Sequence, residues 1–199
     1  MAHGHRNLTR RAALQGVAGL VIGLYLPGGS ARTQPVAQAH RPASAAAAFT
    51  PNAFVRVGTD DTVTVLIKHI EFGQGPLTGL ATLVAEEMDA DWSKVRAEHA
   101  PTDTDLYKNL AFGIQGTGGS TAIANSYEQM RRAGATARAM LVAAAAEAWR
   151  VPAVEITVQN GVMHHAASGR EGRLGQFAEA ASRVSVPENV PSRTRRRSD

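Results

Sequence analysis

The sequence predicts an α/β fold in which helices pack on a mixed sheet. Two periodic patterns in the 199 residues support this prediction. In residues 62–68, Val63, Val65 and Ile67 share one face at every second position, which is the period of a half-buried strand, and residues 154–158 and 162–164 flank an Asn-Gly turn that is typical of a hairpin. Residues 76–89 and 123–148 carry them at steps of three and four, which is the period of amphipathic helices. Glycine-rich turns separate these segments, and alternation between the two periods is typical of a sheet covered by helices.

The first 39 residues have the pattern of a twin-arginine export signal. Arg10 and Arg11 precede an apolar run at residues 16–26, which is too short to span a bilayer as an isolated helix. A chance arginine pair in a structureless N-terminus is the alternative. The pattern predicts export to the periplasm by the twin-arginine route, with association to the membrane as a further expectation.

An Ala/Ser/Pro linker is expected at residues 40–48, and the predicted domain covers residues 49–191. The expected strands are residues 52–57, 62–68, 95–99, 154–158 and 162–164. The expected helices are residues 76–89, residues 123–148 and a short closing helix at residues 174–181. The first two strands form one hairpin and the last two form another, whose Asn160-Gly161 turn readily adopts φ > 0. Small residues such as Gly134 along the second helix would let another helix or a sheet approach it closely.

Two glycine-rich loops each lead into a predicted helix. The first glycine loop comprises residues 71–75, and the second comprises residues 115–121. Glycine permits tight turns and lets a ligand approach the main chain, while a helix N-terminus offers N–H groups to an anion. This combination would suit a phosphate-bearing cofactor held in one cavity shared by both loops. On spacing alone, ordinary turns between a strand and a helix are the favoured interpretation.

Three ordered motifs carry a resemblance to a known family. They are EFGQGPLT at residues 71–78, LVAEEMDADW at residues 83–92 and QGTGGS at residues 115–120. Together they resemble the molybdopterin-binding subunit of the xanthine dehydrogenase superfamily. The pattern is most similar to the isoquinoline 1-oxidoreductase β-subunit and the exported aldehyde dehydrogenase type. The resemblance covers most of residues 49–191 and implies the fold of the N-terminal piece of a molybdenum-cofactor-binding domain.

The resemblance implies molybdopterin as the cofactor, in its plain or cytosine dinucleotide form. By that similarity the cofactor-binding residues are Gly73, Gln74, Gly75, Gly118, Gly119 and Ser120. It further implies an iron–sulfur cluster carried by a partner subunit and a cytochrome c as electron acceptor. The implied activity is oxidation of an aldehyde or hydroxylation of an N-heteroaromatic carbon.

No catalytic residue is predicted. The family's glutamate base belongs to a distant C-terminal motif that no position of this sequence matches. Because the family's subunits are several times longer, we expect a truncated subunit that is inactive alone.

No metal site is predicted either. The chain has no cysteine, which excludes disulfides and Cys-ligated iron–sulfur clusters in it. His69 has no second ligand at metal spacing, and His164 and His165 would point to opposite faces of a strand.

The positive charge of the chain lies at its two ends. Residues 1–41 carry five arginines and no acid, and residues 193–199 carry four arginines and one aspartate. When these charges of +5 and +3 are taken from the formal total of +4, residues 42–192 carry −4. Nucleic-acid binding rests on a basic face of the folded domain, so we expect none.

Residues 192–199 form a basic tail that does not resemble the family, and we expect it to be disordered. Such a tail is what premature termination or a shifted reading frame would produce. Alternatives to the truncated oxidoreductase subunit are a secreted, non-enzymatic α/β binding or assembly module and a nonfunctional gene remnant.

Overall fold

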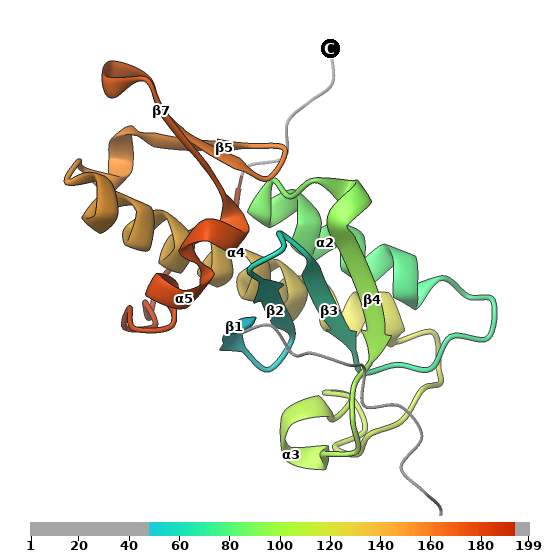
Figure 1. The fold of residues 1–199 in the computed structure, drawn as a ribbon. Coiled ribbons are helices and arrows are strands. Elements are labelled where there is room, and N and C mark those ends of the chain that lie inside the picture. Colours follow the sequence, from blue (N-terminus) through green and yellow to red (C-terminus); the bar gives the residue numbers. More distant parts are fainter. Residues whose placement is uncertain (1–47, 194–199) are drawn as a thin grey trace, which may run out of the picture. The chain divides into compact units, whose positions relative to one another are not determined.

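The computed structural model describes residues 48–193, with side chains from Asn52 onward (Figure 1). The predicted export signal at residues 1–39, the linker as far as residue 47 and residues 194–199 lie outside the described part. Within residues 48–193, no helix is both long and apolar enough to cross a lipid bilayer.

A mixed four-stranded sheet forms one layer of the domain. Its strands, in spatial order, are β1 (Ala48–Asn52), β2 (Val55–Gly58), β3 (Val63–Ile67) and β4 (Val95–His99). The first three strands pair antiparallel, whereas β3 and β4 run parallel. The predicted mixed sheet is confirmed.

The strand predicted at residues 52–57 is interrupted by a turn. The Oδ1 atom of Asn52 accepts a hydrogen bond from the N–H of Phe54 over 2.9 Å. Such a local side-chain bond stabilises a turn in place of an extended chain. The prediction of one continuous strand is therefore wrong, and the segment supplies the end of β1 and most of β2.

Two helices cover one face of this sheet (Figure 1). Helix α2 (Pro76–Met88) makes the crossover that the parallel pair β3 and β4 requires, and α4 (Ala122–Trp149) packs against α2. Both predicted helices are thus confirmed to within a residue at each end.

Gly134 permits the close packing of α4 on α2. A Cβ atom at this position would lie 2.8 Å from the carbonyl oxygen of Val84 and 2.9 Å from the Cβ of Glu87. Contacts this short leave no room for a side chain. The expectation that small residues let a neighbour approach this helix is confirmed.

The core lies between the sheet and the two helices. Its largest fully buried apolar side chains are Ile67, Leu80, Met88, Met130, Leu141, Met163, Leu174, Val55 and Val57. The residues of α2 and α4 in this group follow the predicted helical period.

A second sheet of three antiparallel strands follows α4. It contains β5 (Ile156–Gln159), β6 (Val162–His165) and β7 (Arg170–Arg173). The turn between β5 and β6 has φ of 47° at Asn160 and 76° at Gly161, which confirms the predicted two-residue turn. The sequence prediction missed β7.

The remaining short elements connect these layers. They are α3 (Thr104–Tyr107), α5 (Ala178–Ala181) and the 3-10 turns η1 (Trp92–Lys94), η2 (Ala153–Glu155), η3 (Ala166–Ser168) and η4 (Leu174–Phe177). The last turn and α5 together make up the predicted closing helix.

Arg193 is bound to the end of α2. Its N–H donates to Glu87 Oε2 over 2.7 Å, and its Nη1 lies 2.6 Å from Asp89 Oδ2. The expected disorder of residues 192–199 stays a prediction.

Candidate functional site

The two glycine loops lie at the same edge of the first sheet. The first glycine loop follows the end of β3, and the second lies in the connection that follows β4 (Figure 1). Parallel neighbours end at a common edge, so both connections leave the sheet side by side. The N–H of Ile70, the residue before the first loop, donates to Thr117 Oγ1 of the second loop over 2.9 Å and holds the two loops next to each other. This edge, beyond the carboxyl ends of parallel strands, is where open α/β sheets bind ligands.

The first glycine loop is shaped by two residues with positive φ. Gly73 has φ of 106° and Gly75 has φ of 87°, and a Cβ atom at either position would meet nothing within 4 Å. The side-chain amide of Gln74 closes the loop on itself. Its Oε1 accepts from the N–H of Phe72 over 2.8 Å, and its Nε2 donates to the carbonyl of Ile70 over 2.6 Å. The main chain of this loop is open to an approaching ligand, whereas the Gln74 amide is engaged within the loop.

Glu71 takes the N–H groups that the sequence had assigned to an anionic ligand. Its Oε1 accepts from Gly73 over 2.7 Å and from Gly75 over 3.0 Å, and its Oε2 accepts from Leu77 over 3.2 Å. These backbone donors, led by Gly75, hold the pKa of the Glu71 carboxyl below its usual value. In this geometry the three N–H groups are not free donors, which differs from the sequence-based expectation.

The second glycine loop is organised by Asn109, which is fully buried. Its Nδ2 donates to Thr121 Oγ1 over 2.8 Å and to the carbonyl of Gly116 over 3.3 Å. Thr121 Oγ1 in turn donates to the carbonyl of Gly118 over 2.8 Å. The next residue, Gly119, has φ of 58°, and the ring of Phe112 would lie 3.5 Å from its Cβ. The bend at Gly118 and Gly119 therefore depends on a buried amide beneath it.

Ser120 has φ of 56°, an uncommon conformation for a residue with a side chain. It is exposed, as is Gly119. All six predicted cofactor-binding residues thus lie on the two loops, and whether they bind a cofactor stays a prediction.

Two buried polar side chains anchor the first glycine loop to its surroundings. His69 Nε2 lies 3.1 Å from Ser126 Oγ of α4, and burial lowers the pKa of His69, with a smaller contribution from the charge of Lys68. Its Nδ1 makes no hydrogen bond with any described residue. Lys68 Nζ donates to Gln129 Oε1 over 2.7 Å and to the carbonyl of Lys108 over 3.1 Å. Burial also lowers the pKa of Lys68.

A hollow of about 380 Å³ lies between the ends of β3 and β4 and the second glycine loop. Its lining residues are Ile67, Lys68, His69, Ile70, His99, Ala100, Thr102, Thr104, Gln115, Gly116 and Thr117. None of the six predicted cofactor-binding residues lines it. The structure therefore brings the two loops together, but this hollow is not a cavity shared by their predicted binding residues.

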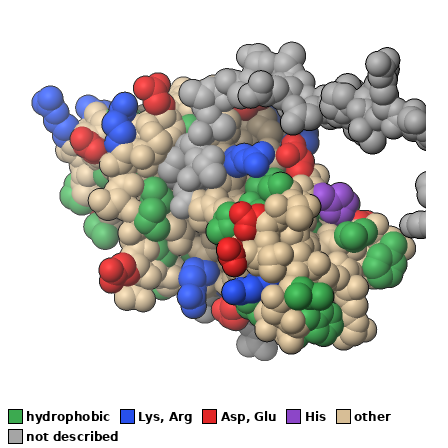
Figure 2. All heavy atoms as spheres, turned by 90° about the horizontal axis from the view of Figure 1, so that it is seen from below, with side chains coloured by type: hydrophobic (Ala, Val, Ile, Leu, Met, Phe, Trp, Pro, Cys, Tyr) green, Lys and Arg blue, Asp and Glu red, His purple; other side chains and the backbone are tan. Residues whose placement is uncertain are grey.

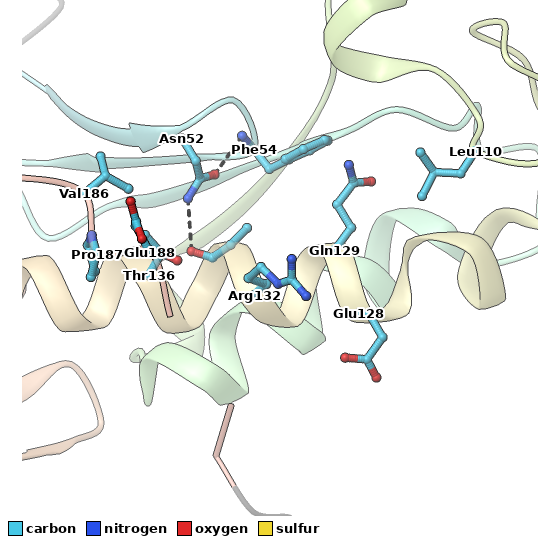
Figure 3. A pocket seen from close by; sticks show the side chains of 11 residues that line it. Asn52, Phe54, Leu110, Glu128, Gln129, Arg132, Thr136, Val186, Pro187 and Glu188 are labelled. Atoms are coloured by element: carbon cyan, nitrogen blue, oxygen red, sulfur yellow. Dashed lines mark hydrogen bonds between the residues drawn. The ribbon is translucent and has the colours of Figure 1, made fainter. Parts of the chain in front are cut away.

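A larger hollow of about 700 Å³ runs along α4, away from the predicted binding residues (Figure 3). Its lining residues are Asn52, Phe54, Leu110, Glu128, Gln129, Arg132, Ala133, Thr136, Val186, Pro187 and Glu188. The close view shows side chains from α4 on one side and residues 186–188 on another, with Asn52 bonded to the α4 backbone. The lining of this hollow contains one cationic side chain and two carboxylates, so it has no excess of positive charge that could bind a phosphate.

The connections that carry the glycine loops also expose large apolar side chains. These are Ile70, Phe72, Leu106, Leu110, Phe112 and Ile114. Figure 2, which views the molecule from the side of α3, shows hydrophobic side chains gathered in patches on this face. Contiguous exposed apolar patches are typical of surfaces that bind a ligand or another protein.

Sequence reasoning missed the residues that hold these loops in shape. Glu71 was part of a quoted motif, and Thr117 lay within the second loop, but neither was assigned a role. Asn109 lay outside the predicted elements and gave no signal of burial. An acidic side chain often accepts hydrogen bonds from backbone N–H groups a few residues further along a turn. The position of Glu71 two and four residues before Gly73 and Gly75 was the one signal that could have identified its role.

Comparisons with known proteins agree with the motif resemblance. A family model described as a molybdopterin cofactor-binding domain matches residues 10–195. The isoquinoline 1-oxidoreductase subunit beta of Brevundimonas diminuta is 42% identical over 146 residues, which are 73% of this chain and 18% of that protein. The membrane-bound aldehyde dehydrogenase (pyrroloquinoline-quinone) of Gluconacetobacter polyoxogenes is 30% identical over 160 residues, which are 80% of this chain and 19% of that protein. The chain therefore spans less than a fifth of the length of these relatives.

Among solved structures, the Cu,Mo-CO dehydrogenase in its CO-reduced state has a similar fold. Its TM-score is 0.51 at 20% sequence identity, with 64% of this chain and 16% of that chain covered. At this identity the likeness concerns the fold alone, and it agrees with the mixed α/β architecture.

Proposed function

The chain belongs to the molybdopterin-binding oxidoreductases of the xanthine dehydrogenase superfamily, and from this premise we propose that it forms one wall of a molybdopterin site in an exported enzyme. The proposed reaction is oxidation of an aldehyde or hydroxylation of an N-heteroaromatic carbon. The names of the two curated relatives support these substrate classes, since one is an isoquinoline oxidoreductase and the other an aldehyde dehydrogenase.

One observation carries the proposal. The two glycine loops, far apart in sequence, meet at the carboxyl edge of β3 and β4 through the bond from Ile70 to Thr117. A ligand placed at this edge would reach both loops at once. Separate turns on different sides of the domain would have given no common binding face.

The residues present fit a cofactor that lies against the main chain. Gly73 and Gly75 leave open space where other residues would carry a Cβ, so a flat ligand could approach the backbone. We propose that Gly73, Gln74 and Gly75 contact the pterin and that Gly118, Gly119 and Ser120 form the second contact. The cofactor, when bound, supplies the redox chemistry, while the protein orients it and excludes water.

The other components of the enzyme are proposed to lie outside this chain. A chain without cysteine cannot ligate a cluster through cysteine, so an iron–sulfur cluster would need a partner subunit. The first relative is itself named as a subunit, which supports this arrangement. A cytochrome c is the proposed electron acceptor, and we propose the periplasm as the location, with membrane association suggested by the name of the second relative.

We propose that this chain has no turnover on its own. It spans less than a fifth of its curated relatives, and no residue in it matches the family's glutamate base. Its residues would bind and orient the cofactor, and the base would come from elsewhere in the enzyme.

The test is cofactor retention by the purified chain produced in cells that make molybdopterin. We expect molybdenum by mass spectrometry and pterin fluorescence after oxidation, both reduced by Gln74→Ala and retained in the control Gln159→Ala. Gln159 is an exposed residue of β5, outside both loops. Absence of both signals from the parent chain would contradict the proposal. A quinone cofactor without molybdenum would also contradict it, and the name of the second relative makes this a necessary assay.

A secreted, non-enzymatic binding module is the second candidate. The engagement of the first glycine loop by its own Glu71 and Gln74 favours it, because such a loop is complete without a ligand. The same retention assay separates the two candidates, since a module of this kind would bind neither molybdenum nor pterin.

A further inference from the structure

Helix α2 begins without a capping side chain of its own. Its N-cap residue is Gly75, in the left-handed region, and its first turn contains no acidic residue. The first N–H groups of a helix have no partner within the helix and carry partial positive charge. An acceptor from outside the helix is therefore expected to stabilise this end.

Glu71 supplies that acceptor from the preceding loop. One carboxylate oxygen receives the N–H groups of Gly73 and Gly75, and the other receives the N–H of Leu77 in the first turn. Two glycines with positive φ turn their N–H groups toward a common point, and a carboxylate fits there as an anion would. Bonds to an ionised acceptor are stronger than neutral ones.

Gln74 completes the arrangement from the other side of the loop. Its amide spans from the N–H of Phe72 to the carbonyl of Ile70, so both polar ends are engaged within the loop. The Glu71 carboxylate and the Gln74 amide thus fix the backbone of residues 70–77 from within. No described lysine, arginine or histidine forms an ion pair with Glu71, so its charge faces backbone donors alone.

We propose that Glu71 is a positioning residue whose carboxylate, rather than a bound cofactor, occupies the N–H groups of Gly73, Gly75 and Leu77 and thereby shapes the cofactor-facing loop. A ligand then meets the open side of the glycines, where a Cβ would find no atom within 4 Å. The part of this inference that concerns the cofactor rests on the proposed function, whereas the part that concerns the loop does not.

The test is backbone amide exchange measured by NMR on the full chain labelled with ¹⁵N. In Glu71→Ala we expect exchange at Gly73, Gly75 and Leu77 to rise about tenfold or more, as the loss of bonds to a charged acceptor predicts. Glu71→Gln keeps one acceptor oxygen, so we expect Gly73 and Gly75 to stay partly protected while Leu77 loses protection. A merely destabilising substitution would not produce this graded pattern.

Glu86→Gln is the matched control, because it removes one charge from an exposed residue of α2. We expect it to leave the three amides unchanged. Equal protection in the parent and in Glu71→Ala would overturn the inference.

A second arm tests whether an external anion competes with Glu71. Addition of inorganic pyrophosphate to the parent chain should leave the amide shifts of Gly73, Gly75 and Leu77 unmoved. A saturable shift at these amides would overturn the inference, because the donors would then be available to a ligand. If Glu71→Ala loses protection but the parent retains no pterin, the inference on the loop stands and the proposed function fails.

Discussion

The N–H of Ile70 donates to Thr117 Oγ1 over 2.9 Å, although 47 positions separate the two residues. Ile70 directly precedes the first glycine loop, and Thr117 belongs to the second. The residues just before Ile70 bind the elements on either side of the second loop, because His69 Nε2 lies 3.1 Å from Ser126 Oγ of α4 and Lys68 Nζ donates to the carbonyl of Lys108 after α3. The two loops therefore form one structural unit, and a change at either is expected to affect the other.

Replacement of Thr117 by valine should loosen this unit without unfolding the domain. Valine has a similar shape but no hydrogen-bond acceptor, so the N–H of Ile70 would donate to water instead. Because this bond is solvent-exposed, the free energy of unfolding should fall by less than about 1 kcal/mol. We expect amide exchange at Ile70 to rise about tenfold, an effect of the order of one lost hydrogen bond. Thr117→Ser keeps the hydroxyl and should behave like the parent, and unchanged exchange in Thr117→Val would contradict the role of the bond.

Two glycines in the packed helices should respond in opposite ways to alanine. At Gly134 the new Cβ would lie 2.8 Å from the backbone oxygen of Val84, which cannot move without displacing α2. Gly134→Ala should therefore reduce the free energy of unfolding by about 1–3 kcal/mol, the usual cost of overpacking. At Gly79 the new Cβ would meet only the side chain of Ile123, whose terminal methyl lies 2.9 Å away and can move. Gly79→Ala should be neutral or stabilising by up to about 1 kcal/mol, because alanine favours helix.

Urea denaturation of the two variants measures this difference. Equal stabilities for Gly134→Ala and Gly79→Ala would show that α4 can move away from α2 at little cost.

The buried carboxylate of Glu87 should contribute far more to stability than an exposed one. Glu87 is 2% exposed, and it accepts from Arg131 Nε over 2.6 Å and from the N–H of Arg193 over 2.7 Å. Glu87→Ala would leave the Arg131 charge without its partner, at a cost of about 2–4 kcal/mol given that Arg131 retains some access to water. Glu179→Ala is the control, since its pair with Arg183 spans 3.6 Å between two largely exposed side chains. That pair should contribute below about 0.5 kcal/mol.

In urea denaturation at neutral pH, the unfolding midpoint of Glu87→Ala should therefore lie well below that of Glu179→Ala. Similar midpoints for the two variants would mean that solvent reaches the Glu87 and Arg131 pair freely.

The helices could be predicted because their sequence pattern is local. Pro76 in the first turn and apolar residues at Leu80, Val84 and Met88 define α2 without reference to any other segment. Strand β7 carries no such signal, since its residues Arg-Glu-Gly-Arg lack alternation. It becomes a strand because β6 offers it a free edge, which only the tertiary structure provides.

The location of the glycine loops could be predicted, but their internal bonding could not. Asparagine is usually found in exposed loops, yet Asn109 is fully buried. The chain folds back over it and places Gly116 and Thr121 within reach of its side-chain amide. Glu71 stands in the motif, but its carboxylate reaches three N–H groups only once Gly73 and Gly75 adopt positive φ. Burial and acceptor choice depend on these conformations, which a sequence pattern does not specify.

The titration of Glu71 should be visible at the amides that it binds. Its pKa is lowered from the ordinary value of 4.5 because backbone N–H groups, led by that of Gly75, favour the charged carboxylate. A carboxyl with a depressed folded-state pKa stabilises the loop fully above its unfolded pKa. The stabilisation is lost as the pH falls from about 4.5 through the lower folded-state value. The loop bonds should thus be intact at neutral pH and weaken only in acid.

The measurement is the ¹H shift of the Gly75 amide as the pH is lowered. In the parent chain we expect a titration with its midpoint below 4.5, and in Glu71→Gln we expect this transition to be absent. Asp60 and Asp91 also have lowered pKa values, but they bond to Thr62 and Ser93 rather than to this loop, so their titration should leave the Gly75 amide unmoved. A midpoint at or above 4.5 would mean that the Gly73 and Gly75 N–H groups do not stabilise the carboxylate. The first glycine loop would then owe its shape to the glycines and Gln74 alone.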